Sequence, residues 1–251
     1  MSTASLPITS FLAGLSAPRL HALFSQEPQR AADWVYVTAV EGLPQAQVCY
    51  GRMLLEGTGR GKDPVAALAW FRRAAASGDL DGINMVGRCL DNGWGTAKDP
   101  AAAAVQFLCA ADAGHAWAQY NLGHLYLDGR GVPRDVERAY TYYLRAAEQQ
   151  HERAMNLVAR CCEEGWGTPR NMAAAAAWYR RSAEQGYFRG QYNWATLLQN
   201  ARRFDEAAHW FEKAARSGPP AMRQAVIDLG IAVGACDALR ALAERLSSQS
   251  R

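Results

Sequence analysis

The sequence predicts an all-α protein, an α-solenoid in which antiparallel helix pairs stack on one another. Three observations predict it. A G-x-G turn returns every 36 residues, as at Gly57 and Gly59 and again at Gly93 and Gly95. Small and apolar residues recur at helical spacing between these turns, and alanine is abundant while valine and isoleucine are sparse. A fixed period of this length is typical of repeat proteins, in which each unit buries its apolar face against its neighbours.

The first helix of each predicted unit is marked by small and apolar residues at positions i, i+4, i+5 and i+8. In the third unit these are Ala118, Leu122, Gly123 and Tyr126, which fall on one face of a helix. The i+5 position is small in every unit and comprises Gly51, Gly87, Gly123, Ala159 and Ala195. We expect a neighbouring helix to approach closely there. The G-x-G turn then ends the helix, because glycine readily adopts the left-handed conformation of a helix C-terminus.

The second helix is expected to start at an N-cap column that comprises Asp63, Asp99, Asp135 and Asn171. Such side chains accept a hydrogen bond from a free amide of the first helical turn. Pro64 and Pro100 follow two of them directly, which suits the first helical position. In the first unit we expect the buried face of this helix at Ala67, Phe71 and Ala74.

These signals divide the chain into consecutive segments. Residues 1–41 are expected to hold a degenerate capping hairpin, and residues 219–251 the C-terminal capping helices and a tail. The four full units are residues 42–78, 79–114, 115–150 and 151–186. A fifth unit, residues 187–218, lacks the four-residue G-x-G insertion and is expected to turn at Asn200 to Arg203.

The third unit shows the repeat pattern in full. Its residues are Ala118-Gln-Tyr-Asn-Leu-Gly123, Tyr126, Gly129-Arg-Gly131-Val132, Asp135, Ala139, Tyr143, Ala146 and Ala147. With these residues the chain resembles the Sel1-like repeat family, which is similar to the tetratricopeptide repeats. The resemblance covers more than two-thirds of the chain. It implies a right-handed α-solenoid and a non-catalytic role as an adaptor, scaffold or regulatory protein.

The cysteines bear on an alternative function. One secreted, cysteine-rich branch of that family has been linked to β-lactam binding, and its cysteines pair between the helices of each repeat. Membership of that branch would imply binding of a β-lactam or a peptidoglycan fragment. Here Cys89, Cys161 and Cys162 fall in apolar core columns, where a free thiol behaves as a small hydrophobe. Cys109 replaces a basic column and is expected to be more exposed, which leaves a redox or modification role open.

Charge and hydropathy exclude several classes of partner. The net charge is +3, from 27 basic and 24 acidic side chains, and no block of like charge stands out, so nucleic acid is not expected. No stretch approaches the ~18 apolar residues of a membrane helix, so membrane insertion is not expected either. No Lys or Arg precedes the apolar patch at Phe11 to Leu15, which argues against a secretory signal. We therefore expect a cytoplasmic protein.

No motif for catalysis or metal binding is found. The histidines occur singly, without H-x-x-x-H spacing, at His21, His115, His124, His151 and His209. The segment Gly57 to Asp63 is similar to a phosphate-binding loop, but Glu56 stands where that loop needs glycine. Because the same segment recurs in other units, it is interpreted as the repeat turn with its helix cap. We expect neither an enzyme nor a cofactor.

Two polar columns of the first helix fall off its predicted buried face and are candidate partner-binding residues. One is basic and comprises Arg52, Arg88, His124 and Arg160. The other alternates amide and aromatic residues, and with its neighbours it comprises Asn84, Tyr120, Asn121, Asn156, Tyr192 and Asn193. Basic groups at the repeat spacing could clamp the carboxylates of an acidic peptide, and tyrosines would supply flat contact area.

Alternatives to binding exist for these columns. The residues four positions after the basic column could neutralise it; they are Glu56, Asn92, Asp128 and Glu164. Trp94 and Trp166 share a turn position and either form a binding edge or pack on the next repeat. The favoured hypothesis is that the chain binds a protein or peptide partner, which could be acidic. Self-assembly into a homodimer through the solenoid edges is the other open possibility.

Overall fold

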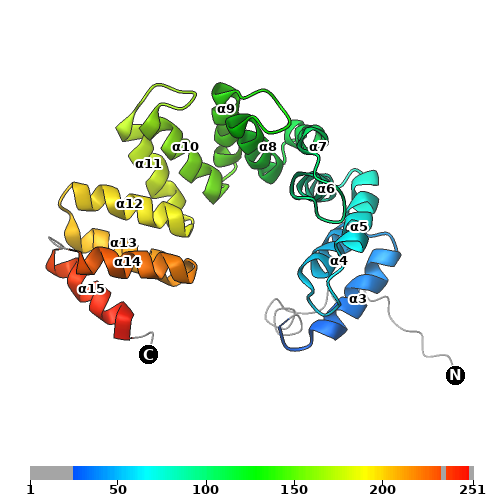
Figure 1. The fold of residues 1–251 in the computed structure, drawn as a ribbon, viewed down its shortest axis with the longest axis horizontal. Coiled ribbons are helices and arrows are strands. Elements are labelled where there is room, and N and C mark those ends of the chain that lie inside the picture. The colour runs from blue at the N-terminus through cyan, green and yellow to red at the C-terminus, as the bar shows by residue number, and fades with distance from the viewer. Residues whose placement is uncertain (1–24, 233–235, 249–251) are drawn as a thin grey trace. The chain divides into compact units, whose positions relative to one another are not determined.

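The computed structural model describes residues 25–232 and 236–248, so Phe11 to Leu15 and His21 lie outside the described residues. Thirteen helices and no strand occur within those ranges (Figure 1). The helices are α3 (Pro28–Val40), α4 (Pro44–Glu56), α5 (Pro64–Ala76), α6 (Leu80–Asn92), α7 (Pro100–Asp112), α8 (Ala116–Asp128), α9 (Val136–Glu148), α10 (Glu152–Glu164), α11 (Met172–Glu184), α12 (Phe188–Asn200), α13 (Phe204–Ser217), α14 (Pro220–Ile231) and α15 (Asp237–Ser248). The prediction of an all-α protein is confirmed.

The described chain forms two compact units, with the sequence boundary between Arg134 and Asp135. In the first unit each helix from α3 to α8 packs against the next one, and α4 also packs against α6. In the second unit each helix from α9 to α15 packs against the next one, and α10 also packs against α12. First helices thus contact the first helices of the next repeat, as in an α-solenoid, and the predicted fold class is confirmed.

Side-chain oxygens cap the second helices as predicted. The N-capping residues are Asp63, Asp99, Asp135 and Asn171, and each accepts a hydrogen bond from the amide three residues later, at 2.9–3.0 Å. Such a bond satisfies an amide that has no partner within the helix and contributes about 1 kcal/mol. The segment Gly57 to Asp63 is therefore a turn with a helix cap, as interpreted, rather than a phosphate-binding loop.

Three first helices have caps of their own. Asp79 caps α6, and the imidazoles of His115 and His151 cap α8 and α10. Each imidazole accepts the backbone amide proton at Nδ1, at 3.2 Å. A histidine that stands alone in the sequence therefore fixes the start of a helix in these two repeats.

The two glycines of each G-x-G turn have different tasks. Gly93 has φ +77° and ends α6, where its amide donates to the Cys89 carbonyl at 2.8 Å. Gly95 has φ +70° and lies against the first turn of α5, so that an added Cβ would come within 2.6 Å of the Pro64 carbonyl carbon. The first glycine stops the helix, and the second lets the turn pack on the preceding repeat.

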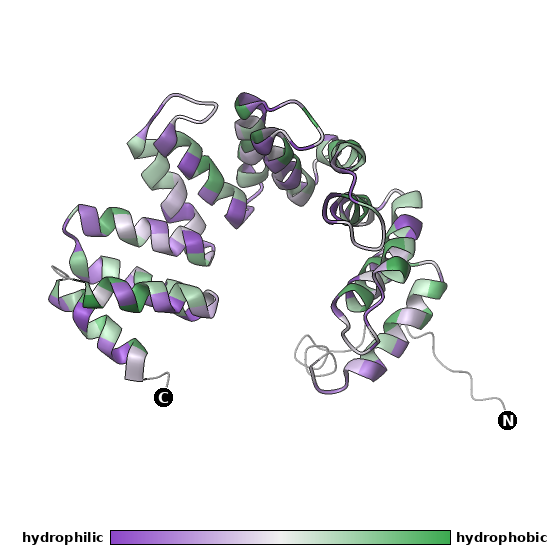
Figure 2. Cartoon of the chain, in the orientation of Figure 1, coloured by the Kyte–Doolittle hydropathy of each residue, from purple (hydrophilic) through white to green (hydrophobic). Residues whose placement is uncertain are grey.

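The same column of each second helix carries a buried aromatic ring, at Phe71, Phe107, Tyr143, Tyr179 and Phe211. These rings face the small column of the first helices. A Cβ added at Gly87 would lie 2.6 Å from Cε1 of Phe107, and one at Gly51 would lie 2.5 Å from Cε1 of Phe71. The prediction that this column permits close helix approach is confirmed. Hydrophobic and hydrophilic residues share the length of the helices, as expected for helices buried on one face only (Figure 2).

The cysteines are free thiols, and Cys89, Cys161 and Cys162 are buried as predicted. Burial raises the pKa of the Cys89 thiol to about 11 and that of Cys161 to about 12, which leaves both thiols protonated and unreactive at neutral pH. Cys109 is exposed, as predicted. The inter-helix disulfides that the β-lactam-binding alternative needs are not formed.

Two further findings concern membranes and metals. Among the helices of residues 25–232 and 236–248, none combines the length and the apolar character needed to cross a bilayer. Within the same described ranges, no cluster of three or more His, Cys, Asp or Glu side chains is arranged to hold a metal ion.

Candidate functional site

The basic column lies on the first helices. In the first unit Arg52 is on α4, Arg88 on α6 and His124 on α8, and in the second unit Arg160 is on α10. Each side chain has a different environment. The basic column is therefore not a uniform row of cations.

Arg52 is held by the next repeat. Its guanidinium lies 3.5 Å from Oδ1 of Asp81 on α6, instead of pairing with Glu56 four residues later on its own helix. The same carboxylate lies 3.4 Å from Nε2 of His115, whose Nδ1 accepts the Ala118 amide proton. His115 therefore carries its proton on Nε2 and donates it to Asp81. This chain of contacts joins three consecutive repeats.

The contacts of Asp81 make stability depend on pH. The hydrogen bond from His115 is the main cause that lowers the pKa of the Asp81 carboxyl, with the charge of Arg52 adding to it. A lowered folded-state pKa stabilises the fold above the ordinary carboxyl pKa of about 4, and the effect is lost as the pH falls through the folded-state value. Asp81→Asn is expected to reduce the unfolding free energy at pH 5 by a few tenths of a kcal/mol, because the side chain is half exposed.

Urea denaturation of wild type and Asp81→Asn at pH 5 and pH 2 measures this effect. The two proteins should differ at pH 5 and converge at pH 2. A difference that persisted unchanged at pH 2 would show that the carboxylate charge of Asp81 is not its cause.

Two arginines of the column lie over tryptophans. The guanidinium carbon of Arg88 is 5.2 Å from the ring centre of Trp94, and that of Arg160 is 5.0 Å from the ring centre of Trp166. Arg88 also donates to the sulfur of Met85 at 3.4 Å. Trp94 and Trp166 are half-buried, and each is packed on an arginine of its own repeat. The indoles position these guanidinium groups through a cation–π contact.

His124 differs from the arginines of its column. It packs edge-on against Tyr120 with ring centres 4.7 Å apart. Burial is the main cause that lowers the pKa of His124, so the imidazole is neutral at pH 7. The basic column therefore carries no positive charge at this position at pH 7, because the side chain is desolvated between its neighbours.

The amide column is mostly structural. Asn84 and Asn156 are buried, with 3% and 7% of their surface exposed, so the interpretation that this column lies off the buried face is wrong for both. Asn121 donates to the oxygen of Asn84 at 2.9 Å, and Asn193 donates to that of Asn156 at 2.8 Å. The residues of each pair lie 37 positions apart, so these bonds join one repeat to the next.

The tyrosines of the candidate set are half-buried. Tyr120 packs against His124 and lies edge-on to Trp117 at 5.9 Å. Tyr192 lies edge-on to the buried ring of Phe211 at 5.1 Å. Each tyrosine is therefore fixed on one side by a neighbouring ring and keeps part of its surface in contact with solvent.

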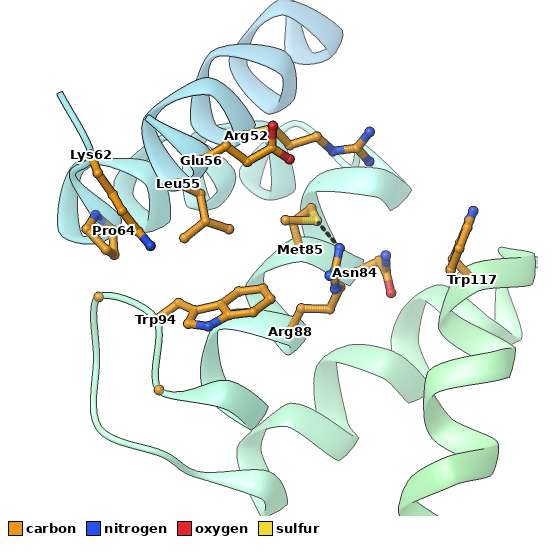
Figure 3. A pocket seen from close by; sticks show the side chains of 12 residues that line it. Arg52, Leu55, Glu56, Lys62, Pro64, Asn84, Met85, Arg88, Trp94 and Trp117 are labelled. Atoms are coloured by element: carbon orange, nitrogen blue, oxygen red, sulfur yellow. Dashed lines mark hydrogen bonds between the residues drawn. The ribbon is translucent and has the colours of Figure 1, made fainter. Parts of the chain in front are cut away.

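A pocket of about 660 Å³ opens between α4, α6 and the start of α8 in the first unit (Figure 3). Its lining, which defines what we call the Trp94 pocket, comprises Arg52, Leu55, Glu56, Lys62, Pro64, Asn84, Met85, Arg88, Gly93, Trp94, Gly95 and Trp117. The indole of Trp94 lies opposite Leu55, Arg88 lies beside the indole, and the buried Asn84 lies between Arg88 and Trp117. The turn after α6 thus supplies an aromatic surface, and the first helices supply polar groups.

The lining of the Trp94 pocket carries more positive than negative charge. Arg52, Lys62 and Arg88 are cationic, whereas Glu56 is the one carboxylate among the lining residues. Guanidinium groups bind carboxylates through paired, charge-assisted hydrogen bonds. A pocket with this lining suits an anionic group that is attached to an apolar one.

Lys62, Met85 and Trp117 are among the lining residues that were not singled out from the sequence. The signal for Lys62 is a basic residue directly before each N-cap, at Lys62, Lys98, Arg134 and Arg170. This basic column was not considered for binding, because the segment that contains Lys62 was compared with a phosphate-binding loop and then interpreted as the repeat turn. Met85 and Trp117 carry no comparable signal, since an apolar residue on a helix is usually part of the core.

This geometry defines an α-solenoid repeat protein with a pocket on its first-helix face. The sequence model of the Sel1 repeat matches five segments of the chain, residues 44–79, 80–115, 118–151, 152–187 and 189–219. The matches cover more than half of the chain, which therefore belongs to the Sel1 repeat family.

Solved structures share the fold. A Sel1 repeat protein from Oxalobacter formigenes is 24% identical, with 94% of this chain and 99% of that chain covered and a TM-score of 0.77. A protective antigen of uropathogenic Escherichia coli with an SLR fold is 26% identical at a TM-score of 0.66; the match covers 89% of this chain but only 50% of the antigen. An immunity protein from Pseudomonas aeruginosa is 14% identical at a TM-score of 0.55, with 82% and 80% covered. No curated protein matches the chain.

Proposed function

We propose that this chain is a non-catalytic adaptor that binds an acidic segment of a partner protein in the Trp94 pocket. The observation that carries the proposal is the lining, in which Arg52, Lys62 and Arg88 accompany an indole and outnumber the single carboxylate of Glu56. The cations would bind a carboxylate, and the indole would cover an apolar side chain beside it. The preferred segment therefore combines Asp, Glu or a chain terminus with a large apolar residue.

Two further observations support this reading. The ion pair of Arg52 with Asp81 is exposed on both sides, and such pairs contribute little, so a ligand carboxylate can replace Asp81 at small cost. The free thiols suit a reducing compartment, which favours an adaptor of the cytoplasm.

Peptide display on the wild-type protein, followed by titration of the selected consensus as a synthetic peptide, tests the proposal. We expect a consensus with an acidic and an apolar residue. Arg88→Glu should weaken its binding at least tenfold, because a carboxylate then faces the ligand carboxylate. Arg73→Glu is the matched control, since Arg73 lies over Trp70 at 4.4 Å but does not line the pocket.

Both substitutions remove one cation–π contact, so both should lower the unfolding free energy by about 1 kcal/mol or less. Only Arg88→Glu should weaken the peptide. A consensus without acidic residues, or an equal loss of affinity in the two variants, would contradict binding in the Trp94 pocket.

A further inference from the structure

The columns that line the Trp94 pocket return two repeats later. Asn84, Met85 and Arg88 recur 72 residues on as Asn156, Leu157 and Arg160, and Arg189 occupies the column of Trp117. In the second unit these residues line a pocket of about 330 Å³ between α10 and α12. Its lining, which we call the Arg160 pocket, comprises Asn156, Leu157, Arg160, Glu163, Tyr179, Arg189, Tyr192, Asn193 and Met222.

The Arg160 pocket is smaller and more polar than the Trp94 pocket. Trp166 lies beneath Arg160 but outside the lining, and an arginine replaces the second indole of the first pocket. Asn156 is buried and is fixed by the 2.8 Å bond from Asn193. A buried, oriented amide beside two guanidinium groups is a preorganised polar site.

The one carboxylate of this pocket already has a partner. The hydroxyl of Tyr179 donates to Glu163 at 2.7 Å. Burial of the ring, and after it this bond, raise the pKa of Tyr179. The phenol therefore stays protonated and keeps Glu163 bonded across the helix pair. Arg160 and Arg189 are the two cations that remain to meet an incoming anion.

We propose that the Arg160 pocket is a second carboxylate-binding site, which takes an acidic segment of a partner protein. This inference rests on the proposed function, because it takes the same ligand chemistry from the Trp94 pocket. The smaller volume and the second arginine suit a carboxylate whose apolar neighbours remain outside the pocket.

A ¹⁵N NMR titration separates the two sites. The probe is acetyl-Asp-Glu-Leu-Phe with a free C-terminus, and the control is its uncharged counterpart acetyl-Asn-Gln-Leu-Phe amide. The indole resonance of Trp94 reports on the first pocket, and that of Trp166, beneath Arg160, reports on the second. We expect both resonances to shift with the acidic probe, at a stoichiometry of two peptides per chain, and neither with the control.

Arg160→Glu should abolish the binding event sensed at the second pocket and leave the Kd at the Trp94 pocket within twofold. Arg189→Glu, on a different helix, should do the same and guards against a local folding defect. Arg181→Glu is the matched control, because Arg181 lies over Trp178 at 4.2 Å outside the pocket.

The outcomes distinguish the two proposals. Binding of one peptide at the Trp94 pocket, unchanged by Arg160→Glu and Arg189→Glu, would overturn the second site and leave the proposed function standing. Shifts at neither tryptophan, or equal shifts with the uncharged control, would contradict carboxylate binding at both pockets.

Discussion

Gly87→Leu is expected to lower the unfolding free energy by about 3 kcal/mol. A Cβ at this position would lie 2.6 Å from Cε1 of Phe107, whose ring is buried, and leucine adds three more carbon atoms. Neither α6 nor α7 can move away without losing contacts to the next repeat, because stability in a solenoid comes from neighbouring interfaces. Helix propensity alone would give the opposite sign, since leucine favours a helix by about 1 kcal/mol over glycine.

Urea denaturation followed by circular dichroism measures the effect. Gly61→Leu is the control, since no atom lies within 4 Å of a Cβ there, and a change within about 0.5 kcal/mol is expected. A Gly87→Leu protein as stable as the wild type would show that α6 and α7 are not in close contact at this point.

Gly95→Ala is expected to be nearly as damaging, although it adds a single methyl group. Gly95 has φ +70°, and its Cβ would lie 2.6 Å from the carbonyl carbon of Pro64 and 2.9 Å from Cα of Val65. The left-handed conformation costs about 1 kcal/mol, and the clash with backbone atoms brings the total to about 3 kcal/mol. Relief of the clash would move the turn and Trp94 with it, so peptide affinity should fall as well.

Gly78→Ala isolates the cost of the left-handed conformation. Gly78 has φ +78°, yet no atom lies within 4 Å of its Cβ position. Gly78→Ala should therefore lower the unfolding free energy by this conformational cost alone, about 1 kcal/mol, and leave the peptide affinity unchanged. Equal destabilisation by the two alanine substitutions would mean that the turn after α6 does not pack on α5.

The repeat could be predicted from the sequence because its signals are local. A cap such as Asp99 acts on an amide three residues away, and the left-handed φ of Gly93 follows from the preference of glycine itself. The turn of the shortened fifth unit also falls where it was expected, between the end of α12 at Asn200 and the start of α13 at Phe204. Each of these features depends on a few neighbouring residues only.

The candidate site was predicted in part. Arg52, Arg88 and Trp94 were identified as candidates, and the structure brings them into one pocket. Lys62 was not identified as a candidate because its segment was interpreted only as the repeat turn with its helix cap. His124 was counted among the basic residues, but its charge depends on burial that no spacing reveals.

The sequence by itself determined the helices, their ends and the columns that must be small, because these follow from backbone conformation and period. Only the tertiary structure decided which polar residue meets which. Arg52 pairs with Asp81, 29 positions away, and Asn121 bonds Asn84, 37 positions away. The angle at which one repeat stacks on the next determines which polar residues come into contact. That angle results from the packing of whole side chains across the interface.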